Sequence, residues 1–169
     1  GYIGGKWVDA DSGKTFKVLN PFDNSVITEL PDMGRAETSK AIEAADKVFV
    51  SWSDLNPNER KNILDTWTQL VVDNIDDLAI ILTTEQGKPL AQARSEYAYV
   101  LEIMSLYAGE ALRLHGQTLP STSPDKRTIV IRQPFGVTAG ISPWNYPAST
   151  VMNKMAPALA SGNTIVVKP

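Results

Sequence analysis

The sequence predicts an α/β protein in which a β-hairpin and a layer of helices precede one βαβ unit of a doubly wound parallel sheet. Three observations support this prediction. Two short β-rich segments near the start are separated by the turn residues NPFDN. Apolar residues recur at three- and four-residue spacing through the middle of the chain. The last part of the chain has a strand-like, a helix-like and a second strand-like segment in succession.

The first predicted elements are two short strands and an amphipathic helix. TFKVL at 15–19 and SVITEL at 25–30 are rich in β-branched and aromatic residues, so we expect them to pair as a hairpin. A helix follows, because apolar side chains at helical spacing form one stripe. The stripe consists of Ala41, Ile42, Ala45, Val48, Phe49 and Trp52.

Three further helices are predicted in the middle of the chain. The first begins at the capping residue Asn56, followed by Pro57 and the capping-box acid Glu59. The second covers about 78–86 and ends at a glycine, and the longest covers about 90–114. The apolar face expected for the first of them consists of Ile63, Trp67, Leu70 and Val71.

The βαβ unit is predicted from the segment that follows. Residues 116–127 are rich in Ser, Thr and Pro and predict a loop, and 128–133 predict a strand of mixed exposure. The apolar segments 137–141 and 164–168 are typical of strands buried on both faces of a parallel sheet, with a helix over 147–160 between them. The inward face expected for that helix consists of Val151, Met155 and Leu159.

Composition excludes several classes of function. A net charge of -3 and a pI near 5.2 provide no broad positive surface, so we expect neither nucleic acid nor membrane as a partner. The absence of Cys excludes a disulfide framework, a thiolate metal site and a Cys nucleophile in this chain, and no metal site is predicted. The start GYIGGKWVD lacks signal-peptide features and resembles the interior of a longer chain, and we expect a cytoplasmic protein.

The segment ISPWNYP at 141–147 is the candidate functional site, because ligands of open α/β sheets bind where a strand ends and the next helix begins. A GxGxxG dinucleotide loop is absent there. Two interpretations of Asn145 stay open. Held between two prolines, its amide suits the stabilisation of an oxyanion by a donor placed in advance. Alternatively it caps the helix or bonds its own loop, and the residues alone favour this second interpretation.

The chain resembles the aldehyde dehydrogenase superfamily over almost its whole length. The segment GVTAGISPWNYPASTVMNKMAPALASGNTIVVKP is similar to the first βαβ segment of that family, and IGGKWV, LNPFDN, EQGKPL and HGQTLP match its amino-terminal half in order. EQGKPL and HGQTLP further resemble the succinate-semialdehyde dehydrogenase branch. The resemblance implies that residues 1–169 are an incomplete, amino-terminal portion of a Rossmann-like cofactor-binding domain, with part of an oligomerisation segment at about 117–135.

The resemblance also assigns roles to individual residues. Asn145 matches the oxyanion-stabilising Asn of the family. Lys154 matches a lysine near the nicotinamide end of the cofactor, although an ordinary exposed helix lysine is an open alternative. Asn153 stands where the succinate-semialdehyde branch carries an Arg that binds the distal carboxylate of the substrate, so it is a candidate substrate residue. The positions that match the cofactor-lining part are Ile141, Ser142, Pro143, Trp144, Asn145, Lys168 and Pro169.

The expected function is therefore part of an NAD(P)-dependent aldehyde dehydrogenase that oxidises succinate semialdehyde or a related semialdehyde to the acid. NAD or NADP is the expected cofactor, a small aldehyde the expected ligand, and a homodimer or homotetramer the expected assembly. Without the Cys nucleophile, this chain alone is expected to be inactive. Two alternatives stay open: a non-catalytic nucleotide-binding or assembly module, and a dehydrogenase for another aldehyde because of Asn153.

Overall fold

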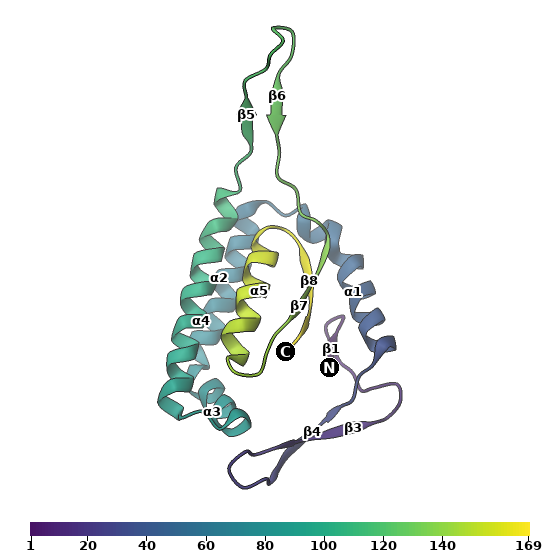
Figure 1. Ribbon diagram of the computed structural model, residues 1–169, viewed down its shortest axis with the longest axis vertical. Coiled ribbons are helices and arrows are strands. Elements are labelled where there is room, and N and C mark those ends of the chain that lie inside the picture. The colour runs from purple at the N-terminus through teal and green to yellow at the C-terminus, as the bar shows by residue number, and fades with distance from the viewer.

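The computed structural model describes residues 1–169, and Figure 1 shows helices standing on both sides of a pair of strands. The elements in chain order are β1 (Tyr2–Ile3), β2 (Lys6–Trp7), β3 (Thr15–Leu19), β4 (Val26–Pro31), α1 (Arg35–Ser53), α2 (Pro57–Asp73), α3 (Ile75–Gln86), α4 (Leu90–Glu110), the 3-10 turn η1 (Ala111–Arg113), β5 (Gln117–Leu119), β6 (Thr128–Val130), β7 (Val137–Ile141), α5 (Pro147–Ala160) and β8 (Thr164–Lys168). No helix among them is long and apolar enough to cross a bilayer.

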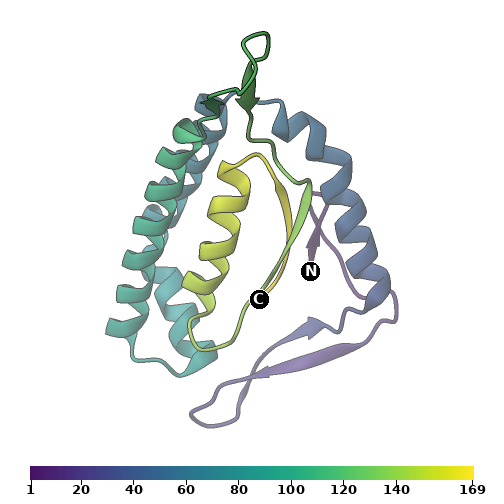
Figure 2. The same cartoon turned by 45° about the horizontal axis from the view of Figure 1, so that its top comes forward.

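The predicted βαβ unit is confirmed. β7 and β8 pair in parallel, with a register that runs from Val137 opposite Thr164 to Ile141 opposite Lys168. α5 covers one face of this pair and α1 the other (Figures 1 and 2). The prediction that both strands are buried on both faces is wrong for most positions, which are half-buried or exposed. The reason is that the sheet consists of these two strands alone, so each has an unpaired edge.

The main core lies between α5 and the helices α2 and α4. α4 packs along α5 and α2, and its small residue Ala108 allows close approach. The buried apolar residues of the two clusters here are Val71, Val100, Ile103, Met104, Met152 and Ala156, and Leu64, Ala108, Ala111 and Ala160. A third cluster, formed by Ala79, Leu82 and Ala93, joins α3 to α4. This core fixes the position of α5, and with it the loop that precedes α5.

The start of α2 is as predicted, and so is half of its buried face, because Val71 is in the core and Trp67 packs against it. The Asn56 side chain accepts hydrogen bonds from the backbone N–H groups of Asn58 and Glu59 at 3.0 and 3.1 Å. Contrary to the prediction, Ile63 and Leu70 are 48% and 56% exposed. Leu64 and Arg60 take the inward positions instead.

Arg60 explains the rotation of that face. Its guanidinium donates to the carbonyl oxygens of Ala160 at 3.3 Å, Ser53 at 3.3 Å and Leu55, and burial lowers its pKa. An arginine that donates to a carbonyl group at the end of α5 and to two at and just after the end of α1 lies on the inward side of its helix, so the neighbouring apolar residue Ile63 is left on the outside.

The inward face of α5 also differs from the prediction. Met152, Ala156 and Ala160 are buried against the α2–α4 layer. The expected residues Val151, Met155 and Leu159 are only half-buried. The difference arises because α5 lies between the helical layer and the strands, so two of its sides are partly covered and the close contact is on the α4 side.

The three antiparallel pairs are peripheral. The predicted hairpin is confirmed as β3 paired with β4. β1 and β2, which were not predicted, are joined by Gly4 and Gly5, whose φ values of 58° and 79° suit a tight turn. β5 pairs with β6 in the hairpin that projects from the top of Figure 1, so the predicted loop 116–127 contains a strand, and the strand predicted over 128–133 ends at Val130.

Candidate functional site

The loop between β7 and α5 lies at the carboxyl edge of the parallel pair. Ile141 is the register partner of Lys168, and the backbone N–H of Ser142 donates to the carbonyl oxygen of Lys168 at 3.1 Å. Three of the residues assigned to the cofactor are therefore neighbours across this edge. The Lys168 ammonium is exposed and bonds only the adjacent carbonyl of Pro169, at 3.2 Å. The Ser142 hydroxyl is buried without a partner.

Asn145 is exposed, and its side-chain amide makes no hydrogen bond within the chain. The N-cap position of α5 is Tyr146, which also provides no side-chain cap. The structure therefore does not use the Asn145 amide to cap α5. The backbone carbonyl of Asn145, in contrast, accepts from Gln86 Nε2 at 3.0 Å and from Lys88 Nζ at 3.2 Å.

The first turn of α5 is capped by a residue from another helix. Glu96 of α4 accepts hydrogen bonds through Oε1 from the backbone N–H groups of Ala148 and Ser149 at 3.0 and 3.1 Å, and from the Ser149 hydroxyl at 3.4 Å. Its Oε2 pairs with Lys88 Nζ. A carboxylate at this position satisfies free N–H groups of the helix and is favoured by the positive end of the helix dipole.

The Lys88–Glu96 ion pair is removed from solvent. The exposed fractions of the two side chains are 8% and 1%. Lys88 Nζ also lies 4.4 Å from the centroid of the Tyr146 ring, a cation–π distance. Nearby, burial raises the pKa of Tyr97, and the negative charges of Glu96 and Glu85 raise it further.

Lys154 and Asn153 are neighbours on α5 with different surroundings. Lys154 Nζ donates to the Thr150 carbonyl at 2.9 Å, and its Cδ is 3.3 Å from the position that a Cβ on Gly140 would occupy. The stem of Lys154 thus packs on β7, and the side chain is half-buried rather than an ordinary exposed helix lysine. Asn153 is exposed and its side chain makes no hydrogen bond within the chain.

Pro143 and Trp144 complete the loop. Both are exposed, and Trp144 is 80% accessible. The Trp144 carbonyl accepts a long hydrogen bond of 3.4 Å from Gln86 Nε2. The loop therefore presents its side chains outward, while its carbonyl groups are held from α3 and the α3–α4 connection.

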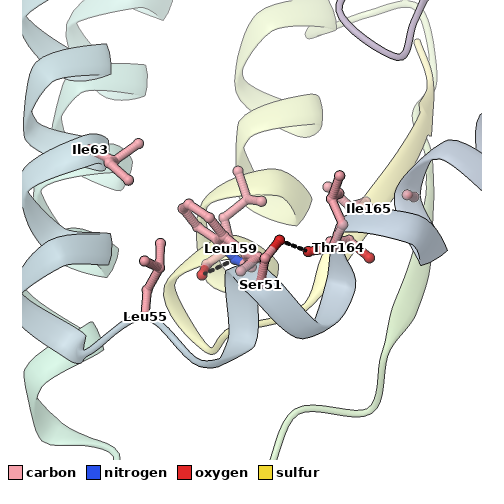
Figure 3. Close-up of a pocket in the computed structure, with 9 residues that line it drawn as sticks. Ser51, Leu55, Ile63, Leu159, Thr164 and Ile165 are labelled. Atoms are coloured by element: carbon pink, nitrogen blue, oxygen red, sulfur yellow. Dashed lines mark hydrogen bonds between the residues drawn. The ribbon is translucent and has the colours of Figure 1, made fainter.

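A separate hollow of about 400 Å³ lies between α1, α2, α5 and β8 (Figure 3). It is lined by Ala45, Val48, Ser51, Trp52, Leu55, Ile63, Leu159, Thr164 and Ile165. The hollow lies at the carboxyl end of α5 and the amino end of β8, the end opposite ISPWNYP. The Ser51 hydroxyl bonds Val48 of its own helix and the Trp52 indole bonds the Leu159 carbonyl, so no charged group is available here to orient a polar ligand.

Sequence reasoning missed Gln86, Lys88 and Glu96. The signal for Glu96 was present: it lies three residues after Ala93 and four before Val100, on the stripe that α4 buries. A carboxylate at a buried helical position requires a partner that is charged or donates hydrogen bonds. The identity of the partners was not visible, since the loop they hold is more than 50 residues further along the chain.

Comparison with known proteins places these features in context. The model of the aldehyde dehydrogenase family matches residues 7–169. A glutarate-semialdehyde dehydrogenase of Pseudomonas putida is 53% identical over 168 residues, covering 99% of this chain and 35% of that protein. The NADP(+) succinate-semialdehyde dehydrogenase of Escherichia coli and a 3-sulfolactaldehyde dehydrogenase of Pseudomonas putida are each 45% identical, with the same coverage.

Solved structures of similar proteins have the same fold over this chain. The succinate-semialdehyde dehydrogenase of Burkholderia pseudomallei has a TM-score of 0.98 at 49% identity, covering 99% of this chain and 35% of that one. PnpE in complex with nicotinamide adenine dinucleotide has a TM-score of 0.96 at 34% identity, covering 99% and 34%. The chain thus spans about a third of the length of the proteins that it matches.

Proposed function

Because the chain belongs to the aldehyde dehydrogenase family, we propose that it forms the amino-terminal portion of the cofactor-binding domain of an NAD(P)-dependent enzyme that oxidises an aldehyde to the carboxylic acid. One observation carries the proposal. The Asn145 amide is exposed and unbonded at the carboxyl edge of the parallel pair, while its backbone is held from two other segments. A donor held in this way is ready for a charge that develops during the reaction.

The proposed role of Asn145 is to donate a hydrogen bond to the oxyanion that forms when a nucleophile attacks the aldehyde carbonyl. The chain contains no Cys, so the thiolate that the family uses must come from outside these residues. Lys154, anchored on β7 and bonded to Thr150, would add a positive charge to the same side of α5 as the strand.

The carboxyl edge of β7 and β8 is the proposed cofactor surface. Ile141 and Lys168 lie opposite each other there, and Ser142 has a buried hydroxyl without a partner that suits a further polar contact. Pro143, Trp144 and Pro169 border the same edge. Bound NAD or NADP supplies the hydride acceptor; the exposed Lys168 ammonium suits hydrogen bonds to ribose hydroxyls.

We propose a semialdehyde or a related aldehyde with a distal anionic group as the substrate. The names of the relatives at 53% and 45% identity specify glutarate semialdehyde, succinate semialdehyde and 3-sulfolactaldehyde, which all carry a carboxylate or sulfonate. Asn153 departs from the Arg that the resemblance places there, and an amide cannot form the bidentate pair that a guanidinium offers. A different aldehyde, or a cation supplied from elsewhere, is the alternative.

Assembly as a homodimer or homotetramer is proposed through the segment 117–135. The hairpin β5–β6 projects from the body of the molecule (Figure 1). Ile129, Ile131 and Phe135 are 69%, 66% and 99% exposed, a concentration of apolar surface that suits contact with another subunit.

The test uses a protein of complete length. Replacing the matching 168 residues of the Pseudomonas putida glutarate-semialdehyde dehydrogenase with this chain yields what we call the exchange protein. We expect it to reduce NAD(P) with glutarate semialdehyde, whereas the chain alone produces none above a buffer blank. Asn145→Ala should lower kcat by on the order of 10² to 10³, the loss typical of one oxyanion donor.

The matched control is Asn58→Ala, which removes another exposed amide, on α2. It should leave kcat unchanged. An exchange protein that folds and assembles without turnover would favour the non-catalytic module, for which the absence of Cys is the supporting observation. Normal kcat with a lowered melting temperature in Asn145→Ala would show that this residue only supports its loop.

A further inference from the structure

Two charged residues outside the ISPWNYP loop contact its end and the helix turn that follows it: Lys88 contacts Asn145 and Tyr146, and Glu96 contacts the first turn of α5. Lys88 follows the end of α3, and Glu96 is in the second turn of α4. We propose that the Lys88–Glu96 ion pair positions the Asn145 amide for catalysis. This inference rests on the proposed function, because it assigns the pair a role that acts through the oxyanion donor.

The hydrogen bonds of the pair go to the loop, to the first turn of α5 and to each other. The two carboxylate oxygens of Glu96 divide their tasks: Oε1 accepts from Ala148 and Ser149 of α5, and Oε2 accepts from Lys88. Glu96 therefore fixes the first turn of α5 directly after the loop. An ammonium has three N–H donors and no acceptor.

The contacts of Lys88 all lie close together. It bonds Glu96 and the Asn145 carbonyl oxygen, the latter at 3.2 Å, and lies 4.4 Å from the centroid of the Tyr146 ring. One cation thus contacts both the Asn145 carbonyl and the ring of the next residue, and Gln86 Nε2 supplies a second donor to the same carbonyl at 3.0 Å. The side chain of Asn145 is bonded to nothing in the chain, so the direction of its amide follows from the backbone that Lys88 and Glu96 fix.

Stability alone does not account for this arrangement. A buried ion pair is often no more stabilising than apolar side chains of similar volume, because both charges lose hydration. The fold also joins α3 to α4 without it, through the apolar cluster of Ala79, Leu82 and Ala93. Two apolar side chains in place of Lys88 and Glu96 could neither donate to the Asn145 carbonyl nor accept from the two N–H groups of α5.

The experiment compares Lys88→Met with Arg94→Met in the exchange protein. Arg94 of α4 pairs with Asp76 of α3 at 3.0 Å, but this pair is exposed, with side chains 53% and 71% accessible. Lys88→Met should lower kcat by about 10- to 100-fold, as expected when a reacting group is displaced by up to about 1 Å. The KM for the cofactor should not change, and Arg94→Met should affect neither constant.

A double-mutant cycle separates positioning from a merely structural role. If Lys88 acts through Asn145, Lys88→Met combined with Asn145→Ala should have the same kcat as Asn145→Ala alone. Losses that multiply would overturn the inference, as would a Lys88→Met variant with normal kcat and only a lower melting temperature. The double variant is informative even if both single variants are slow.

Two further variants cover the case in which Lys88→Met does not fold. Lys88→Arg keeps the charge and the donors, and Glu96→Gln keeps an acceptor for α5 while removing the ion pair. Lys88→Arg should therefore retain most of the kcat, whereas Glu96→Gln should lower it. Glu96→Gln is combined with Asn145→Ala in the same cycle, with the same expected and contrary outcomes as Lys88→Met. A normal kcat in Asn145→Ala itself would instead refute the proposed function, which distinguishes that failure from a failure of the positioning role.

Discussion

Removing the Glu96 carboxylate should strongly destabilise the fold. In Glu96→Ala the backbone N–H groups of Ala148 and Ser149 lose the acceptor that now lies 3.0 and 3.1 Å away. Loss of a helix cap costs about 0.5 to 2 kcal/mol. Lys88, only 8% exposed, would at the same time be left as a buried cation without its counter-ion.

The second effect dominates. Removing one partner of a buried ion pair costs about 3 to 5 kcal/mol. The cap and the ion pair belong to one carboxylate, so their losses are coupled and the two costs are not simply added. We therefore expect Glu96→Ala to lose about 3 to 5 kcal/mol of unfolding free energy. Asp76→Ala, which breaks an exposed pair between α3 and α4, should lose only about 0 to 1 kcal/mol.

Urea denaturation of the 169-residue chain, followed by circular dichroism, measures both values. A companion variant carries Glu96→Leu and Lys88→Met together. It should recover much of the stability lost in Glu96→Ala, because no buried charge remains unpaired. If Glu96→Ala and Asp76→Ala unfold at the same urea concentration, the ion pair is not desolvated in solution and the reasoning is wrong.

Two other predictions concern the substrate and acid stability. In the exchange protein, Asn153→Arg should raise the ratio of kcat/KM for succinate semialdehyde to kcat/KM for a neutral aldehyde of similar length. The expected increase is roughly 10-fold or more, since a charged hydrogen bond is worth about 1.5 to 3 kcal/mol. An unchanged ratio means that this position does not contact the substrate. Hydrogen bonds from the backbone of Asp11 and Gly34 lower the pKa of Glu37 below its ordinary 4.5. The stability that Glu37 provides is therefore present above pH 4.5 and lost as the pH falls through its lower folded pKa. Near neutral pH, Glu37→Gln should have a lower free energy of unfolding than the wild type, and this difference should become smaller in acid. Urea titrations from neutral to strongly acidic pH measure it, and a difference that does not change with pH would contradict the prediction.

Local sequence was sufficient for the βαβ unit. The predicted ranges 137–141, 147–160 and 164–168 are those of β7, α5 and β8. Prolines and glycines mark their ends and the strands are unbroken apolar segments, so the information lies within a few residues of each boundary. The cap of α2 was predictable for the same reason, since Asn56 and Glu59 bond each other's backbone.

The orientation of the helices was not predictable in the same way. Arg60 is buried and Ile63 exposed because the end of α5, 100 residues later in the chain, offers the Ala160 carbonyl to the guanidinium. An apolar stripe indicates that a helix has an inward face, but the neighbours decide which of two adjacent faces it is. The pairing of β5 with β6 was likewise missed, because the first strand lies in a segment with the composition of a loop.

The residues of the segment alone place an asparagine between two prolines at the carboxyl end of a strand, with no thiol in the chain. What holds that asparagine depends on contacts between distant parts of the fold. Glu96 reaches Ala148 across 52 positions of the chain, and Lys88 reaches Asn145 across 57. Local chemistry sets where strands, helices and turns begin. A buried charge, in contrast, pairs with whichever group packs beside it, and that group depends on the whole fold.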